Sequence, residues 1–157
     1  MTNNNIYFIA NWKMFGSNSS IKNINKLISL SKSKKFKNVK IIYCPPYTII
    51  NKFYHKTKNS RIQIGAQNCH HYPNEGAFTG SISSKMIKNS GANYVILGHS
   101  ENRSENDTNK IINAKILSAQ KNNLKVILCI GESLTDNKKK KTKKVLKIQL
   151  EHCLKKV

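Results

Sequence analysis

The amino-acid sequence predicts an α/β fold of five parallel βα units in series, and two observations support this prediction. Short apolar runs alternate along the chain with segments whose apolar residues recur at helical spacing. Most of the runs are continuously apolar and not alternating, as expected of strands in a parallel sheet that is covered on both faces. The predicted strands are residues 6–11, 39–44, 62–65, 94–97 and 124–130.

The segments between the predicted strands carry apolar residues three, four or seven positions apart, which places them on one face of a helix. These residues are Ile21, Ile24 and Ile28; Ile112, Ile116 and Ala119; and Leu146, Leu150, Cys153 and Val157. Pro45 and Pro46 end the second strand and precede a further helix. Repeated βα units imply a parallel sheet with right-handed crossovers, here in a single domain over residues 1–157 without a linker.

Polar residues follow four of the five predicted strands, in segments 11–13, 65–68, 98–101 and 131–132. The pattern fits an open doubly wound sheet or part of a (β/α)₈ barrel, and in barrels the functional residues gather at the carboxyl ends of the strands. A doubly wound nucleotide-binding sheet carries a glycine-rich turn after its first strand, and residues 11–14 contain no glycine. The strand ends are therefore where we expect a functional site.

Two of these strand ends carry side chains suited to an anionic substrate with a carbonyl group. Lys13, beside Asn11, offers a point charge to an anion such as a phosphate ester, and the alternative is a solvated lysine. His99 precedes a polar stretch, and a helix starting there would disfavour a charged imidazole through its dipole. A neutral histidine can donate a hydrogen bond to a carbonyl and stabilise an enolate oxygen. The alternative is a structural histidine at a strand end.

The formal net charge of +21 raises the alternative of a nucleic-acid partner. Of the 28 basic residues only Arg61 and Arg103 are arginine, although arginine is the preferred side chain for phosphate and guanine recognition. The lysines accompany many asparagine and isoleucine residues, as drift in an AT-rich genome would produce. We therefore expect the lysine-rich runs 32–40 and 138–144 to be solvated faces, and no specific nucleic-acid partner.

The cysteine and histidine pattern indicates no metal site. The four cysteines are Cys44, Cys69, Cys129 and Cys153. They form no CxxC pair, and Cys44 and Cys129 are expected to be buried thiols because they lie in apolar runs. A histidine pair follows Cys69, but two adjacent histidines rarely face one ion, and closed zinc sites need four converging ligands.

No run of the sequence is long and apolar enough to cross a membrane, which takes about 20 consecutive residues. The start, residues 1–5, lacks a basic segment, and the apolar run that follows it is too short for a signal peptide. We therefore expect a cytoplasmic protein without a membrane partner.

Five motifs, in order and in register, resemble the triosephosphate isomerase family. They are NWKM at residues 11–14, GAQN at 65–68, GAFTG at 76–80, YVILGHSE at 94–101 and LCIGE at 128–132. The resemblance covers the whole chain and implies an incomplete TIM (β/α)₈ barrel, because a complete barrel takes typically ~250 residues. The implied activity is the interconversion of dihydroxyacetone phosphate and D-glyceraldehyde 3-phosphate through an enediolate, without a metal or organic cofactor.

The resemblance also assigns roles to five residues. Asn11 and Lys13 match the substrate-binding pair, and His99 matches the catalytic electrophile. Glu101 matches the supporting acid beside that site, and Thr79 matches a threonine that reaches into the active site of the neighbouring subunit. The family's reaction uses a glutamate base, a neutral histidine electrophile and a loop that closes to exclude water. The implied partners are a phosphorylated triose and a second copy of the chain in a homodimer.

The sequence departs from the family pattern at two interface positions and in its catalytic base. Ser81 stands where the family usually has a glutamate, and Asn102 where it usually has an arginine, which bears on the dimer contacts. No glutamate matches the base, because Glu132 follows the wrong strand and Glu151 lies in a cationic helix. We therefore expect the N-terminal part of an isomerase, without the base and the lid. The alternatives are a non-catalytic truncated remnant, a basic binding module, or an incomplete sequence of an intact enzyme.

Overall fold

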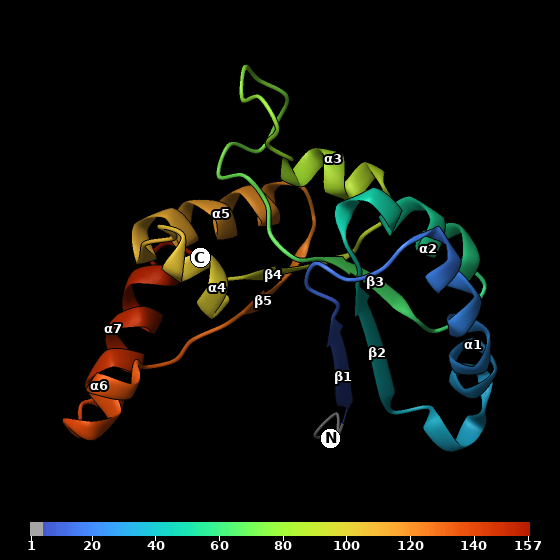
Figure 1. Cartoon of the computed structure of the whole chain (residues 1–157), viewed down its shortest axis with the longest axis horizontal. Helices are drawn as coiled ribbons and strands as arrows, with labels where there is room; N and C mark the ends of the chain where they lie inside the picture. The colour runs from blue at the N-terminus through green and yellow to red at the C-terminus, as the bar shows by residue number, and fades with distance from the viewer. Residues whose placement is uncertain (1–4) are drawn as a thin grey trace.

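The computed structural model describes residues 5–157, so residues 1–4 of the predicted domain lie outside the described residues. Five parallel strands form one sheet in the order β1-β2-β3-β4-β5. They are β1 (Ile6–Asn11), β2 (Val39–Cys44), β3 (Gln63–Ala66), β4 (Tyr94–Leu97) and β5 (Lys125–Leu128). Figure 1 shows the helices along the outer side of the curled sheet, as in part of a barrel wall. The predicted α/β fold of five parallel βα units is thereby confirmed.

Three of the predicted strands have the predicted bounds, and the other two differ at their ends. β3 lies one residue later in the chain than predicted. β5 is shorter than the predicted 124–130, because it pairs only with β4, a strand of four residues. The apolar pattern continues past the last paired residue, so it overestimates the length of the strand.

The helices of residues 5–157 alternate with the strands, and hydroxyl side chains begin several of them. The α-helices are α1 (Asn25–Lys32), α2 (Ile50–Thr57), α3 (Ser84–Asn89), α4 (Ser100–Ser104), α5 (Asn109–Lys121), α6 (Leu134–Lys138) and α7 (Thr142–Cys153). Ser83, Thr108 and Ser133 each accept a hydrogen bond from the first turn of the helix that follows, which satisfies a backbone N–H that has no partner within the helix. None of these helices has the length and apolarity needed to cross a membrane.

The predicted helical faces are found with two differences. The first face is split between a 3₁₀ helix (Asn18–Ile24) and α1, where Ile28 packs against the core. Val157 was expected on the apolar face of the last helix, but α7 ends at Cys153 and Val157 is exposed. The backbone at Lys156 has a positive φ of 61°, which a right-handed helix does not allow.

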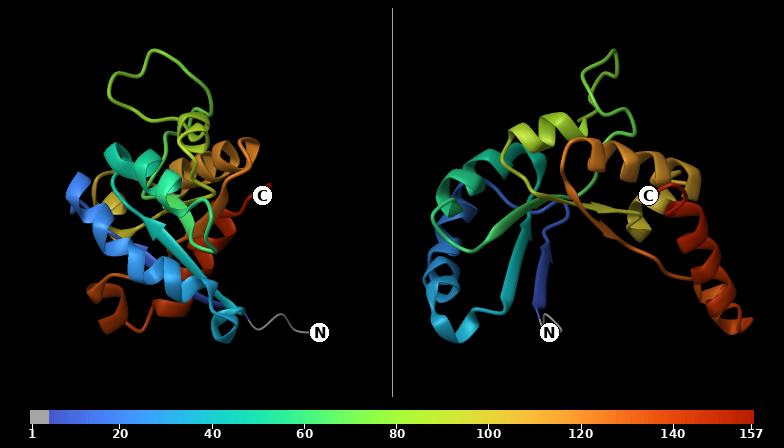
Figure 2. Two further views of the ribbon diagram at one scale, coloured as in Figure 1. Left: turned by 90° about the vertical axis from the view of Figure 1, so that its right-hand side faces the viewer. Right: turned by 180° about the vertical axis from the view of Figure 1, so that it is seen from behind.

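The main core lies between the sheet and its helices, and a smaller cluster lies on the other face of the sheet. Phe53, Ile64 and Leu97 are fully buried or nearly so in the main core. Ile42 and Ile96 belong to the smaller cluster, because successive side chains of a strand point to opposite faces. The views in Figure 2 show the helices gathered on one side of the sheet. The inner face of the curled sheet, which is turned away from the helices, is therefore covered by few side chains of the described residues.

β1 and β5 are the edge strands of the sheet. Ile6 and Phe8 on β1 are 57% and 60% exposed. Together with Leu27 and Leu30 of α1 they line an open apolar hollow of ≈ 680 Å³. An apolar edge strand without charged or bulged protection is a template for pairing with another strand.

Candidate functional site

The strand ends bring four of the predicted site residues into one pocket of ≈ 220 Å³. Asn11 ends β1 and Lys13 follows it, while His99 and Glu101 follow β4. The carboxyl ends of parallel strands lie at the same edge of the sheet, so residues distant in sequence meet there. The pocket is completed by Tyr47, Gln67, Asn68 and Asn102.

A tight turn after β1 presents Lys13 to the pocket. The backbone N–H of Trp12 donates to the carbonyl oxygen of Cys44 at the end of β2, at 3.1 Å. Lys13 then takes a positive φ of 52°, which is uncommon for a residue with a side chain. The Asn11 side chain accepts a hydrogen bond from the Lys13 backbone N–H at 3.0 Å and so stabilises this conformation. Asn11 therefore positions Lys13 as well as lining the pocket.

The charge of Lys13 is paired within the site. Its Nζ atom lies 2.8 Å from Oε1 of Glu101, and both side chains are about half exposed. The hydrogen bond from Lys13 lowers the pKa of the Glu101 carboxyl, and the positive charge of Lys13 lowers it further. Glu101 is therefore ionised at neutral pH, and it holds the ammonium of Lys13 between β1 and β4.

His99 lies at the start of α4, where its imidazole caps the helix. Its Nδ1 atom accepts a hydrogen bond from the backbone N–H of Glu101 at 3.3 Å and lies 3.4 Å from Oε2 of the same residue. In a neutral ring whose Nδ1 accepts the backbone bond, the proton is on Nε2, because an accepting nitrogen carries no hydrogen. In this form His99 can donate a hydrogen bond through Nε2. A neutral imidazole is what the sequence predicts for a histidine at a helix start.

The backbone before His99 is held in place by Gly98 and Arg103. Gly98 has a φ of +73°, and a Cβ atom there would come within 2.9 Å of the carbonyl oxygen of Cys129. Arg103 donates from Nε to the carbonyl oxygen of Gly98 at 2.8 Å and from Nη2 to that of Cys129 at 3.2 Å. The guanidinium thus ties the ends of β4 and β5 together beneath His99.

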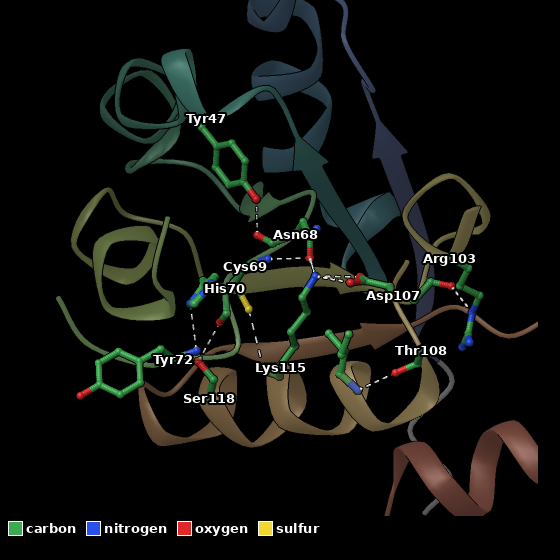
Figure 3. A network of polar contacts seen from close by, with 12 residues as sticks. Tyr47, Asn68, Cys69, His70, Tyr72, Arg103, Asp107, Thr108, Lys115 and Ser118 are labelled. Atoms are coloured by element: carbon green, nitrogen blue, oxygen red, sulfur yellow. Dashed lines mark hydrogen bonds and ion pairs between the residues drawn. The ribbon is translucent and has the colours of Figure 1, made fainter. Parts of the chain in front are cut away.

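A polar network supports the floor of the pocket (Figure 3). The Tyr47 hydroxyl donates to the carbonyl oxygen of Asn68, and the ammonium of Lys115 donates to Oδ1 of Asn68 at 3.0 Å. Lys115 also lies 2.7 Å from both carboxylate oxygens of Asp107. Gln67 donates from Nε2 to the carbonyl oxygen of Cys44 at 2.8 Å. These bonds fix the end of β3 relative to β2 and α5.

Tyr47, Asp107 and Lys115 were not predicted from the sequence as residues of the site. Lys115 had a detectable signal, since it lies three residues after Ile112 and four before Ala119, on the apolar face of α5. A lysine on a buried face needs a partner of opposite charge, and Asp107 is one of only seven acidic residues. No sequence pattern marks Tyr47 in this way, because its hydroxyl contacts Asn68 only in the folded chain.

Thr79 does not lie in this pocket. It is exposed on the segment between β3 and α3, which projects from the body of the molecule in Figure 1. Phe78 on the same segment packs against His70, with ring centroids 4.4 Å apart. Burial of the His70 imidazole lowers its pKa, and the positive charge of Lys115 lowers it further. Contact with another subunit through Thr79 stays a prediction.

The cysteines differ in burial, and among residues 5–157 no cluster of metal-ligating side chains forms. Burial raises the pKa of the Cys44 and Cys69 thiols to about 12, so both are protonated at neutral pH. The prediction that Cys129 is a buried thiol was wrong, because Cys129 follows the edge strand β5 and is partly exposed.

The pocket can bind an anion and polarise a carbonyl group, but it offers few groups that could take a proton from carbon. Lys13 supplies a positive charge and His99 a ring N–H donor, with amide groups around them. Glu101 is the one carboxylate among the described lining residues, and it is paired with Lys13. The arrangement therefore suits an anionic substrate that carries a carbonyl oxygen.

Comparison with known proteins identifies the family to which the chain is similar. The model of the family described as triosephosphate isomerase matches residues 6–157. Triosephosphate isomerases from Alkaliphilus oremlandii and from the Wolbachia of Brugia malayi are 40% and 44% identical over 143 and 141 residues, which is 90% of this chain in each case and 56% and 58% of theirs.

A solved structure agrees with the sequence relatives. The crystal structure of triosephosphate isomerase from Bartonella henselae superposes with a TM-score of 0.88 at 33% identity, covering 94% of this chain and 61% of that one. The chain therefore spans about three-fifths of the length of the relatives that it matches. On the match of the family model over residues 6–157, the chain belongs to the triosephosphate isomerase family.

Proposed function

We propose that this chain carries the substrate-binding and electrophilic part of a triosephosphate isomerase active site. The reaction is the interconversion of dihydroxyacetone phosphate and D-glyceraldehyde 3-phosphate through an enediolate. The observation that supports it most directly is the placing of Asn11, Lys13 and His99 in one pocket at the carboxyl ends of β1 and β4.

Each of these side chains has a role in the proposed reaction. Lys13 attracts the negatively charged substrate to the pocket mouth, and Glu101 and Asn11 hold the lysine in place. His99 donates from Nε2 to the carbonyl oxygen of the triose. As the enediolate forms, negative charge develops on that oxygen and the hydrogen bond strengthens, which lowers the barrier.

The proton transfer needs a carboxylate that is free to act as base, and the described lining residues offer only the paired Glu101. General bases contribute typically 10²–10⁴-fold to a rate. We therefore propose that the 157-residue chain binds the triose but does not turn it over. Thr79 on its projecting segment is proposed to contact a second copy of the chain, as in a homodimer.

The test combines a coupled isomerase assay with NMR of the His99 ring nitrogens during titration with dihydroxyacetone phosphate. We expect no turnover above background and a shift of the Nε2 signal that saturates. Lys13→Met should abolish the shift, whereas Lys22→Met, which removes an exposed lysine outside the pocket, should not. If dihydroxyacetone phosphate leaves the His99 signals unchanged, the proposal fails in favour of a non-catalytic role.

A further inference from the structure

A further hollow lies at the opposite end of the sheet from the candidate active site. It has a volume of ≈ 650 Å³ and is lined by Lys32, Lys34, Lys37, Asn59, Ser60 and Arg61. Lys32 ends α1, and the other residues belong to the connections from α1 to β2 and from α2 to β3. Both connections lead into the amino ends of strands, whereas the active-site pocket lies at the carboxyl ends. The two hollows are therefore separate.

The lining of this hollow, called here the basic hollow, has four cations and no carboxylate. None of the seven acidic residues of the chain precedes Glu75, whereas every residue of the lining does. Like charges gathered in a concave surface focus the electric field and raise the local concentration of anions. Their mutual repulsion in the unliganded chain is relieved when a polyanion lies between them.

Arg61 gives the basic hollow a group with fixed geometry. It is one of two arginines in the chain, and the other, Arg103, is committed to the ends of β4 and β5. Arg61 is half-buried, and its Nη2 donates to the carbonyl oxygen of Ser33 at 2.6 Å. Ser33 lies between two lysines of the lining, so this bond holds the guanidinium beside the turn that carries them. The planar guanidinium has five N–H donors, and paired donors of this kind match the oxygens of a phosphate.

We propose that the basic hollow binds a compact polyanion of two or three linked phosphate groups. One phosphate group is too small to contact all four cations, because they are spread over an open hollow of this size. The lining has no aromatic side chain on which a nucleobase could stack. Recognition therefore rests on the phosphates alone, with Arg61 as the oriented donor and the three lysines as point charges.

The test is titration calorimetry of the whole chain with inorganic tripolyphosphate at physiological ionic strength, where interactions between distant surface charges are screened. Replacing Lys32, Lys34, Lys37 and Arg61 by glutamine should weaken binding at least about tenfold, which corresponds to ~1.4 kcal/mol. The matched control replaces four exposed lysines by glutamine and removes the same charge; two lie at the end of α6 or directly after it, and two lie on α7. These are Lys138, Lys139, Lys143 and Lys144, and their loss should change the affinity by no more than about twofold.

Two further measurements keep the proposal testable if the fourfold variant does not fold. Arg61→Lys retains the charge and removes the planar donor group, so its affinity should fall by several-fold while its circular dichroism is unchanged. Orthophosphate should bind more weakly than tripolyphosphate. Equal weakening by the two fourfold variants, no binding by the original chain, or an unchanged affinity in Arg61→Lys would each overturn the proposal. So would a single-stranded oligonucleotide that displaces tripolyphosphate and binds more tightly.

Discussion

The Nζ atom of Lys115 lies 2.7 Å from both carboxylate oxygens of Asp107, and the two side chains are only 9% and 11% exposed. The same ammonium donates to Oδ1 of Asn68, which lines the candidate active site. Removing one partner of a buried ion pair is costly because it leaves an uncompensated charge out of water. This ion pair therefore stabilises α5 and also holds Asn68 at the floor of the site.

We expect Lys115→Met to lower the free energy of unfolding by about 3–5 kcal/mol, because Asp107 is left buried without its counter-charge. Lys121→Met, at the exposed end of the same helix, should have an effect within about 0.5 kcal/mol. Adding Asp107→Leu to Lys115→Met should restore much of the lost stability, since neither charge remains. Urea unfolding curves measure all three, and a Lys115→Met effect as small as that of Lys121→Met would contradict this account.

Gly98→Ala tests the backbone that precedes His99. The positive φ disfavours alanine, and the new methyl group meets the carbonyl oxygen of Cys129 at 2.9 Å, so we expect a loss of about 1–3 kcal/mol. Gly131→Ala is the matched control, because no atom lies within 4 Å of its added Cβ. The ring signals of His99 should move only in Gly98→Ala. Equal stabilities of the two variants in thermal unfolding would rule out the strain proposed for Gly98.

The sequence predicted the location of the site better than its supporting contacts. Polar residues directly after β1 and β4 could be placed together because parallel strands end at a common edge, and the structure brings Lys13 and His99 into one pocket. The contact between Tyr47 and Asn68 joins residues 21 positions apart, and that between Lys115 and Asn68 joins residues 47 apart. No local periodicity encodes such contacts. Strand β5 was overestimated for a related reason, since its length is set by its partner.

The pH dependence of the site follows from the lowered pKa of Glu101, whose ordinary value is 4.5. A carboxyl with a lowered pKa in the folded chain stabilises it above the ordinary value, and this contribution is lost as the pH falls through the lowered pKa. Carbon-13 NMR should show the carboxyl of Glu101 titrating below pH 4.5. Lys13→Met should raise its pKa, and high salt should do so in part, because the pair is exposed. An identical titration in the Lys13→Met chain would exclude Lys13 as the main cause.

The exposed edge of β1 should make the chain self-associate. Ile6 and Phe8 lie more than half exposed on a strand with one unpaired side, beside the apolar hollow next to α1. Light scattering should therefore show particles larger than one chain at micromolar concentration. Phe8→Lys should reduce their size, because a charge on an edge strand disfavours pairing with another strand. Leu134→Lys adds the same charge at a more exposed residue that lies on α6 and not on a strand. If both variants reduce association equally, added charge and not the edge of β1 controls it.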